Sequence, residues 1–383
     1  MNQLWDVVIV GAGPSGSTLG YELAKSGLRV VILDKEIFPR YKPCGGGLTI
    51  KTVNRIGTDL TSIFKDTIYG TYLTYRMQDE HTLNSDMPIA FTVNRTDFDY
   101  FLLKRAQAAG CDFLEGEKAR NITFDERSAA VMGDVHTYTG RIIVGADGAN
   151  GIVAKSMGLM EDAFIGVSIE SEVEVNSSAL DLLNQHVLLD LGSVFGGYGW
   201  VFPKEDHLSI GVAGPQERAA EVQAYYQAFS DHWKKNLNGY RLIQKRGHRL
   251  PVRHKGSSIQ RGRVLLVGDS AGLTEPLSGE GIYYAVYSGQ LAARAIKSFF
   301  DNPAIHPLEE YQLQLDRELM PEIQRAKAYV KMFNLFPRPF FNLLVSRKRL
   351  WRTTCGFLQG TKTFVDIGKR LGPFEFILDW LAW

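Results

Sequence analysis

Three glycines near the N-terminus have the spacing of a phosphate-binding turn. They are Gly11, Gly13 and Gly16 of "GAGPSG", which follows the apolar run "LWDVVIV" (4–10) and precedes a segment with helical periodicity (14–27). Where such a turn joins a strand to a helix, the first glycine permits the tight bend, the second lets the backbone approach a pyrophosphate, and the third allows close helix–strand packing. The helix N-terminus adds unpaired N–H groups and a positive dipole. The spacing therefore predicts a dinucleotide site.

Three acidic residues follow predicted strands. Asp34 closes "LRVVILD" (28–34), 18 residues after Gly16. A carboxylate there accepts the ribose hydroxyls and repels a 2′-phosphate, which favours FAD or NAD over NADP. Asp147 in "GADGAN" and Asp269 in "GDSAG" follow two later strands, and α/β sheets bind ligands at the carboxyl ends of their strands. An NAD site needs only the first of these turns, whereas FAD is long enough to reach all three strand ends, so we favour FAD.

The "GDSAG" segment also fits the G-x-S-x-G turn of α/β-hydrolases, with Ser270 as the nucleophile. That chemistry requires an acid and a histidine later in the chain and an oxyanion loop earlier. The only histidine after Ser270 is His306, 36 residues on, and no histidine precedes "CGGG". The sequence therefore disfavours a hydrolase.

A run of three glycines follows Cys44 in "YKPCGGGLTI" (41–50). Ordered glycine costs backbone entropy, so such a run is either a flexible linker or a place where a large group lies against bare backbone. The run comes shortly after the strand that ends at Asp34, so the chain is travelling from the adenosine end of the ligand towards its far end. We therefore expect an ordered loop.

The motifs require a parallel sheet. The order strand, glycine turn, helix, strand is a βαβ unit. Further elements are expected as a helix at 96–110, strands at 140–148 and 262–272, a long helix at 278–300, an alternating, strand-rich stretch at about 160–255 and a mostly helical remainder at 308–383. This pattern predicts an α/β protein, with a Rossmann-type FAD-binding domain, an inserted mixed β-sheet substrate domain and a C-terminal helical segment. The expected domains are 1–70 with 93–160 and 258–300 for FAD, 71–92 with 161–257 for substrate, and 301–383 for the helical region.

Composition narrows the class of protein. The 383 residues are 45% hydrophobic and 22% charged, with a net charge of +1, so no overall field calls for nucleic acid. Three scattered cysteines suggest no disulfide framework and fit a reducing compartment. The eight histidines show no paired ligand spacing, so we propose no metal site. No secretory leader and no membrane-spanning run is apparent. We expect a cytoplasmic protein.

The C-terminal part is basic. Residues 331–383 hold nine Lys and Arg against three Asp and Glu, in a chain that is otherwise balanced. The clusters "SRKRLWR" (346–352) and "GKRLGPF" (368–374) lie among Phe, Leu and Trp. This pattern is typical of a helix that binds the inner membrane face peripherally. A helical cap on the core with a solvated basic face explains it equally well.

Together, "GAGPSG", "PCGGG", "VNRTDFDYFL", "GADGANG", "GYGWVFPK" and "PLSGEGI" resemble the FAD-dependent oxidoreductases of the p-hydroxybenzoate hydroxylase superfamily, and within it the geranylgeranyl reductase family. The resemblance covers residues 1 to about 300. Its most specific part is Tyr198-x-Trp200-x-Phe202-Pro203-Lys204, which looks like the YxWxFP signature of prenyl reductases. Taken alone, the same segment is also an ordinary aromatic strand that turns at Pro203.

The resemblance implies roles for individual residues. For FAD, it places Ser15 in the phosphate loop, Asp34 on the adenosine ribose, Cys44, Gly45 and Gly47 beside the flavin, Arg95 in contact with the cofactor, Ala119 at the adenine, Asp269 on the ribityl or pyrophosphate region, and Gly281 and Ile282 beside the flavin pyrimidine. For substrate, it places Tyr198, Trp200 and Phe202 along an apolar tunnel. Independently, a helix that begins near Gly281 can turn its positive end towards the negative charge of reduced flavin.

The implied reaction is the reduction of isolated C=C bonds in a geranylgeranyl chain, with hydride from reduced FAD and a proton from elsewhere. Cys44 is a tentative proton source, but we favour packing against the flavin, because a thiol is a poor acid towards an alkene. No second GxGxxG unit is present, so the reductant stays open between NAD(P)H, ferredoxin and another carrier protein. The substrate stays open between a prenyl diphosphate, an ether lipid, a chlorophyll-type tail and a quinone.

Two further functions share these motifs. A flavin monooxygenase or halogenase of the same superfamily has the same glycine and acid turns, and halogenases also carry an aromatic W-x-W-x-x-P element. The second alternative is a non-catalytic escort protein, which binds prenyl groups on other proteins as Rab escort and GDI proteins do. The "PCGGG" run and the helix that begins at Gly281, both directed at a flavin ring, argue against an escort.

Overall fold

The computed structural model describes residues 4–369, which form two compact units. Within the described residues, unit 1 is made of 4–41, 96–164 and 250–323, and unit 2 of 42–95, 165–249 and 324–369. Each unit therefore assembles segments that are far apart in the sequence. Residues 42–70, which the sequence analysis groups with the FAD-binding domain, lie in unit 2, and residues 301–323 lie in unit 1.

Unit 1 is built on a largely parallel sheet. Its strand order is β17-β18-β11-β1-β2-β8, with β10 and β9 added in antiparallel fashion beside β11. The strands are β1 (Leu4–Val10), β2 (Val30–Asp34), β8 (Asp112–Glu115), β9 (Asn121–Phe124), β10 (Ala129–Met132), β11 (Thr137–Gly145), β17 (Gln260–Arg261) and β18 (Val264–Leu266). β18, β11, β1, β2 and β8 run parallel to one another. Their carboxyl ends therefore meet at one edge, as the motif order requires.

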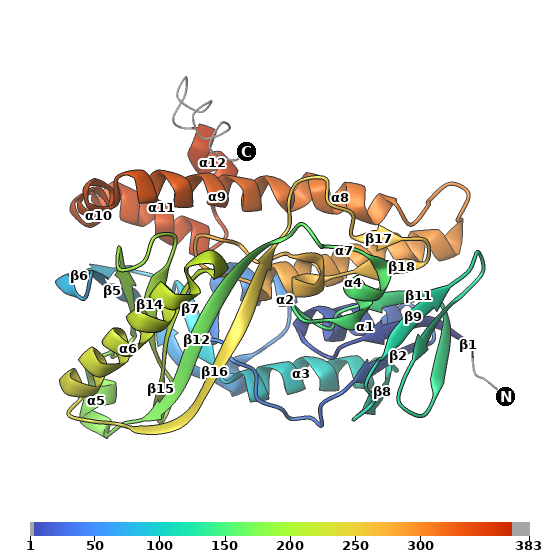
Figure 1. The fold of residues 1–383 in the computed structure, drawn as a ribbon, viewed down its shortest axis with the longest axis horizontal. Helices are drawn as coiled ribbons and strands as arrows, with labels where there is room; N and C mark the ends of the chain where they lie inside the picture. The colour runs from blue at the N-terminus through green and yellow to red at the C-terminus, as the bar shows by residue number, and fades with distance from the viewer. Residues whose placement is uncertain (1–3, 370–383) are drawn as a thin grey trace. The chain divides into compact units, whose positions relative to one another are not determined.

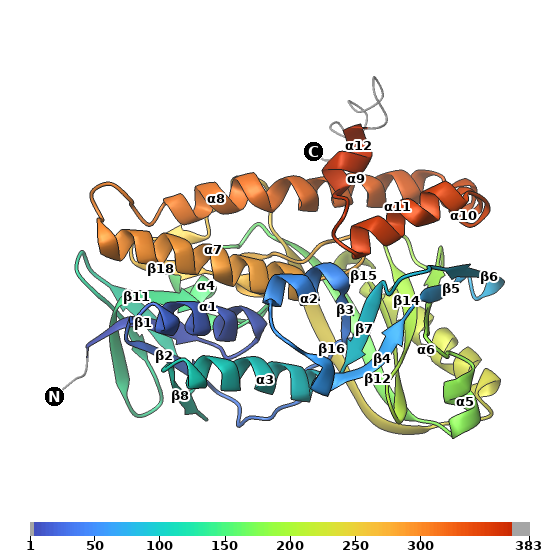
Figure 2. The ribbon, with the colours of Figure 1, turned by 180° about the vertical axis from the view of Figure 1, so that it is seen from behind.

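Helices cover this sheet because its central strands are apolar on both faces. The helices of unit 1 are α1 (Pro14–Lys25), α3 (Arg95–Ala108), α4 (Ile152–Met157), α7 (Ile282–Asp301) and α8 (Glu310–Glu318). α1 and α7 pack side by side (Figures 1 and 2). They approach closely because Gly289 of α7 has no Cβ; a Cβ there would lie 2.7 Å from the carbonyl oxygen of Ser15. The predicted α/β fold class is confirmed.

Unit 2 contains a mixed seven-stranded sheet and a small three-stranded sheet. The larger sheet has the order β16-β12-β15-β14-β13-β5-β6, and the smaller has the order β3-β7-β4. Their strands are β3 (Gly47–Thr49), β4 (Phe64–Ile68), β5 (Gly70–Tyr75), β6 (Gln78–Asn84), β7 (Ala90–Val93), β12 (Phe164–Glu174), β13 (His186–Leu191), β14 (Tyr198–Pro203), β15 (His207–Pro215) and β16 (Arg241–Val252). The predicted signature strand is thus β14, in the middle of the larger sheet.

The two faces of the seven-stranded sheet differ in chemistry because successive side chains in a strand point to opposite faces. One face presents Val201, Leu208, Ile210 and Val212, which form an apolar core with residues of α6 (Ala219–Asn236). The other face carries the signature aromatics and several polar side chains. Figure 1 shows α6 lying along β14 and β15.

The remaining helices are two short ones between strands and four near the C-terminal end of the described residues. They are α2 (Ile50–Ile56), α5 (Ser177–Asp181), α9 (Met320–Leu335), α10 (Pro337–Ser346), α11 (Lys348–Leu358) and α12 (Phe364–Lys369). The second basic cluster of the sequence analysis, 368–374, lies largely outside the described residues. Within 4–369, the structure contains no helix with the length and apolar character needed to cross a bilayer.

Candidate functional site

The turn after β1 has a backbone path that only glycine can follow. Gly11 has a φ of +108°, and a Cβ there would lie 2.3 Å from the carbonyl oxygen of Ala146. A Cβ on Gly16 would lie 1.9 Å from the carbonyl oxygen of Gly11. The first and third glycines therefore allow the turn and α1 to lie against the end of β11, which is the packing that a dinucleotide-binding turn needs.

The start of α1 is suited to a pyrophosphate. Gly13 is the N-cap residue, no side chain caps it, and the first turn holds no acidic residue. The nearest atom to a Cβ on Gly13 would be Nη2 of Arg40, 3.8 Å away. Arg40 is held in place by Asp99, 2.8 Å from its Nη1. Open space, uncapped N–H groups and a neighbouring cation are what an anionic phosphate pair requires, so this turn fits FAD.

Asp34 at the end of β2 has a structural role in addition to the expected one. Its two oxygens accept the backbone N–H groups of Ala12, at 2.7 Å, and Glu36, at 2.9 Å. Burial raises the pKa of Asp34, while these two hydrogen bonds oppose the rise. The carboxylate therefore fixes the glycine turn, and each oxygen keeps a lone pair for a ribose hydroxyl.

Asp147 connects two turns of the sheet edge. Its carboxylate accepts a hydrogen bond from the backbone N–H of Val153 in α4, at 3.0 Å, and another from the hydroxyl of Ser270, at 2.9 Å. Burial raises the pKa of Asp147. The backbone N–H of Gly148 in turn donates to the Ser270 hydroxyl, at 2.9 Å. The turns after β11 and β18 are therefore joined through Asp147.

The same contacts bear on the hydrolase alternative. The Ser270 hydroxyl donates to a carboxylate, whereas a nucleophile elbow pairs its serine with a histidine. His306 lies 3.2 Å from Glu310 in the next helix. The geometry at Ser270 is that of a turn-stabilising residue.

The turn after β18 lies against the phosphate loop and the start of α7. Gly268 has a φ of +58°, and a Cβ there would lie 2.8 Å from Oγ of Ser15. A Cβ on Gly281, the N-cap residue of α7, would lie 3.4 Å from Oδ1 of Asp269. No side chain caps α7 and its first turn holds no acidic residue. The positive end of α7 is therefore available to an anionic ring, as the flavin would require.

In unit 2 the glycine run packs against the signature strand. A Cβ on Gly45 would lie 3.0 Å from the ring of Phe202 and 3.1 Å from Nε1 of Trp200, and a Cβ on Gly47 would lie 3.0 Å from the Phe202 ring. The run is therefore an ordered loop that fits closely over two aromatic rings. The sequence analysis assigned these motifs separately, and the structure shows that they form one substructure.

Lys204, directly after the signature, fastens this loop. The side chain is only 4% exposed, and its ammonium group donates to the carbonyl oxygens of Gly45, at 2.5 Å, and Val93, at 2.8 Å. Burial lowers the pKa of Lys204 to about 8, against the opposing effects of the neighbouring Cys44 and Glu170. A single cation therefore satisfies two backbone acceptors that are 48 residues apart in the sequence.

Gly46 is the most constrained residue of the loop. Its φ is +69°, and a Cβ there would lie 2.2 Å from the carbonyl oxygen of Val93 and 2.4 Å from Nζ of Lys204. Its N–H donates to the sulfur of Cys44, at 3.3 Å. The geometry of this turn thus depends on the absence of a side chain at Gly46, and Cys44 takes part in the turn through its sulfur.

A buried carboxyl group that the sequence analysis did not single out completes this cluster. Glu170 of β12 is 1% exposed and accepts a hydrogen bond from Ser209, at 3.0 Å. Burial raises the pKa of Glu170 to about 7. The signal in the sequence was the alternation of "VSIESEVE" (167–174), which places Glu170 and Glu172 on one face of a strand in which the other face is apolar.

The expected site residues thus fall into two groups. In unit 1 the strand-end turns and α7 bring together Gly11, Gly13, Ser15, Gly16, Asp34, Asp147, Asp269, Gly281 and Ile282, while Ala119 is buried between β8 and β9. Unit 2 contains Cys44, Gly45, Gly47, Arg95, Tyr198, Trp200 and Phe202. Arg95, at the start of α3, is buried and lowers the pKa of Lys204 through its charge.

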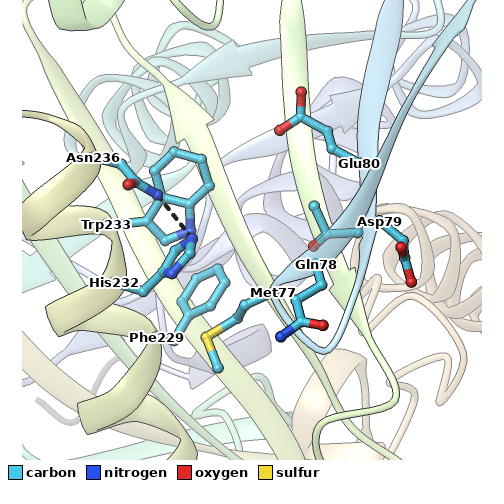
Figure 3. Close-up of a pocket in the computed structure, with 9 residues that line it drawn as sticks. Met77, Gln78, Asp79, Glu80, Phe229, His232, Trp233 and Asn236 are labelled. Atoms are coloured by element: carbon cyan, nitrogen blue, oxygen red, sulfur yellow. Dashed lines mark hydrogen bonds between the residues drawn. The ribbon is translucent and has the colours of Figure 1, made fainter.

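A small cavity of unit 2 is separate from both groups. It has a volume of about 120 Å³ and lies between the β5–β6 hairpin and α6 (Figure 3). Figure 3 shows His232 and Asn236 on one helix, with their side-chain nitrogens 2.8 Å apart. The lining residues are Thr74, Met77, Gln78, Asp79, Glu80, Phe229, His232, Trp233 and Asn236. None of the expected site residues lines this cavity.

Comparison with known proteins agrees with the geometry at the strand ends. The FAD binding domain family matches residues 5–302. A chloroplastic geranylgeranyl diphosphate reductase from Oryza sativa is 28% identical, over 85% of this chain and 74% of its own. A menaquinone reductase from Mycobacterium tuberculosis is 28% identical, over 76% of each chain. A geranylgeranyl bacteriochlorophyll reductase-like protein from Thermoplasma acidophilum superposes with a TM-score of 0.80 at 21% identity, covering 98% of this chain and 99% of that one.

The fold and the family match define an FAD-dependent oxidoreductase. The uncapped helix ends and glycine turns of unit 1 are the parts that would hold its cofactor. The chain belongs to the FAD binding domain family, and geranylgeranyl diphosphate reductases are among the relatives to which it is similar.

The constraint at Gly46 gives a first prediction. Gly46→Ala should destabilise the protein by about 2 kcal/mol more than Gly57→Ala, because overpacking adds to the strain of a positive φ. Gly57 is the matched control: its φ is +65°, and the nearest atom to a Cβ there is 3.9 Å away. Chemical denaturation of the two variants measures the difference. Equal losses of stability would show that the contacts with Val93 and Lys204 do not constrain this position.

Lys204 gives a second prediction. Lys204→Met keeps the length of the side chain but leaves two buried carbonyl oxygens without a donor, so the unfolding free energy should fall by about 2–4 kcal/mol. Lys35→Met is the control, because Lys35 and its partner Glu36 are both exposed, and should change stability by less than about 1 kcal/mol. Urea unfolding reports both. A Lys204→Met protein as stable as the control would contradict the fastening role.

Proposed function

We propose that this protein uses FAD to saturate C=C bonds in a geranylgeranyl or related polyprenyl chain. The observation that carries the proposal is the substructure formed by Cys44–Gly47 and the aromatic signature, locked by Lys204. It unites, in unit 2, the "PCGGG" run with the segment that is the most specific part of the resemblance to prenyl reductases. The comparisons support the same class of reaction, since relatives reduce geranylgeranyl diphosphate and menaquinone according to their names.

The two units have different roles in this proposal. The turns of unit 1, with Gly13, Ser15, Asp34 and the N-terminus of α7, hold FAD, which supplies hydride when it is bound and reduced. The signature strand of unit 2 receives the isoprenoid chain. Trp200 is buried and its ring covers Gly211, where a Cβ would lie 2.2 Å from the indole. Tyr198 and Phe202 are only partly buried and are therefore the aromatic surfaces available to a substrate.

The substrate proposed is a prenyl chain on a diphosphate, a lipid, a quinone or a chlorophyll-type headgroup, and the electron donor is NAD(P)H or a reduced carrier such as ferredoxin. Nothing in the residues described above recognises one headgroup. An isolated alkene has no carbonyl group to polarise, so the reaction depends on a nearby hydride, a proton source and an apolar surface.

Anaerobic incubation of the dithionite-reduced holoprotein with the four substrate classes, followed by mass spectrometry, tests the reaction. We expect one class to gain two mass units for each reduced bond. If reduced protein instead forms an oxygen adduct and hydroxylates or halogenates an acceptor, the protein is a monooxygenase or halogenase. A colourless protein that cannot be reconstituted with FAD would favour the escort function.

We further propose that the C-terminal helices bind an anionic membrane surface. Leu335, the last residue of α9, and Phe336, the N-cap residue of α10, are about 60% exposed. The residues that follow expose basic side chains, namely Arg347, Lys348, Arg349 and Arg352. Exposed apolar rings beside basic groups are the pattern of an interfacial helix. The opposite sides of α10 and α11 are buried through Phe341 and Trp351, so these helices also belong to the folded unit.

The membrane proposal is tested with point variants, because deleting residues 340–383 would remove buried side chains. Replacing Leu335 and Phe336 by Glu should weaken co-sedimentation with anionic vesicles at least tenfold and leave thermal stability unchanged, since the change removes apolar contact and adds like charge. Leu313→Glu is the control for an equally exposed leucine, at 68%. Equal binding by all three proteins would sink the proposal.

A further inference from the structure

Glu170 lies on the signature face of the sheet. Strand register pairs Glu170 of β12 with Gly211 of β15, and Gly211 with Trp200 of β14. Residues paired in this way share a face. Because Gly211 has no side chain, the indole of Trp200 lies over it. The carboxyl group and the signature aromatics therefore occupy the same face, opposite the apolar core under α6.

A directed chain of hydrogen bonds determines which oxygen of Glu170 can carry a proton. Nε1 of Trp200, which can only donate, lies 3.2 Å from the hydroxyl oxygen of Ser209. The Ser209 hydroxyl then donates its hydrogen to Oε1 of Glu170, at 3.0 Å. Oε1 is thus an acceptor. Oε2 is buried and meets no donor at standard hydrogen-bond geometry among residues 4–369, so a proton on Glu170 resides on Oε2.

The charges around Glu170 leave its two protonation states close in energy. Burial opposes ionisation, and so does the charge of Glu172, whereas Ser209, the ammonium group of Lys204 and the backbone amide of Cys44 favour it. Arg95 adds positive charge near Lys204. Glu172 itself faces Nε2 of His207, at 3.8 Å.

His207 is another titratable group on this face, which also carries Tyr198 and Glu174. Burial opposes its protonation, but hydrogen bonding to Glu172 and Asp206 outweighs burial and raises its pKa. His207 therefore offsets part of the charge of Glu172, while the ammonium group of Lys204 acts on Glu170 through its charge. The net result is that the pKa of Glu170 is raised to about 7, where a general acid is most effective at neutral pH.

We propose that Glu170 is the proton donor of the reduction. The inference rests on the proposed function and names the group that the alkene chemistry requires. The Oε2–H bond of Glu170 breaks, a C–H bond forms at one alkene carbon, and the hydride that balances the reaction at the other carbon is that of reduced FAD. The Glu170 carboxylate that remains is stabilised by Lys204 and is protonated again from water.

Glu170 is better suited to this step than Cys44. The sulfur of Cys44 accepts the N–H of Gly46, which gives it a part in the loop turn. Glu170, by contrast, carries its proton on an oxygen that forms no hydrogen bond of standard geometry. Lys204 then has two functions: it holds the loop through Gly45 and Val93, and it offsets the negative charge that develops on Glu170.

The raised pKa also predicts how stability depends on pH. The folded state binds a proton at Glu170 between its usual pKa of 4.5 and about 7, whereas the unfolded state has already released it. This contribution to stability is therefore lost as the pH rises through that window. Glu170→Gln resembles the protonated form, so its melting temperature relative to wild type should rise between pH 5 and pH 8.

The test compares Glu170→Gln with Glu172→Gln, its neighbour on the same face of the same strand. On the ligand-free chain, infrared titration should show a carboxylic acid C=O stretch that disappears near pH 7 in wild type and Glu172→Gln, and that is absent from Glu170→Gln. In single turnovers of the dithionite-reduced holoprotein, Glu170→Gln should reduce the prenyl chain at least about 100-fold more slowly. FAD affinity, measured by absorbance titration, should match that of wild type in both variants.

The outcomes separate this inference from the proposed function. A wild-type protein that reduces no prenyl chain overturns the proposed function, whereas an active wild type with a Glu170→Gln variant within threefold of its rate overturns the inference alone. If the wild-type protein shows no carboxylic acid band that titrates between pH 6 and pH 8, the inference is also overturned, whether or not the protein reduces a prenyl chain. A loss of rate with an unchanged acid band in Glu170→Gln would assign the band to another residue and reject Glu170 as the donor.

Discussion

The buried ammonium group of Lys204 is the interaction on which the unit 2 site depends. An ammonium ion is costly to bury, and the cost is recovered only when its donors are satisfied and a counter-charge is near. Two carbonyl oxygens and Glu170 meet these needs. Because one carbonyl belongs to Gly45 and the other to Val93, the cation gives the glycine loop a single conformation. The loop and the signature strand are therefore one unit of structure as well as of chemistry.

In unit 1 the turns are constrained by a different effect, because backbone segments crowd together at one edge of the parallel sheet. Turns from several strands meet there, and Gly11, Gly16 and Gly268 are placed where a Cβ would collide with a neighbouring turn. The buried carboxylates of Asp34 and Asp147 hold those turns by accepting backbone N–H groups. The result is a rigid edge with two uncapped helix ends, which is the environment that an anionic cofactor needs.

The unit 2 site adds a carboxyl group whose pKa is raised to about 7. Glu170 could not keep a proton at pH 7 on an exposed strand, because water stabilises the carboxylate. The sheet provides the necessary burial, since the loop of Cys44–Gly47 lies over the signature face. Stability and reactivity are thus linked, because the contacts that order the loop also remove water from the acid.

The sequence by itself determined the elements and the class of protein. The strand at 4–10, the glycine turn, the following helix and the acids after each strand have local patterns, and they are found where those patterns place them. Glycine spacing and strand periodicity are short-range properties, so they can be recognised in the sequence without the tertiary structure. The fold class and the FAD-binding family follow from these signals.

Only the tertiary structure decided which residues act together. Gly46 is required by its approach to Val93 and Lys204, and Asp147 by its contact with Ser270, pairs that are separated by 47, 158 and 123 positions. Glu170 has no motif around it, and its protonation depends on burial and on Lys204, neither of which a linear pattern records. Distances across a sheet and the loss of water arise only when the chain has folded, because both depend on segments that the sequence keeps far apart.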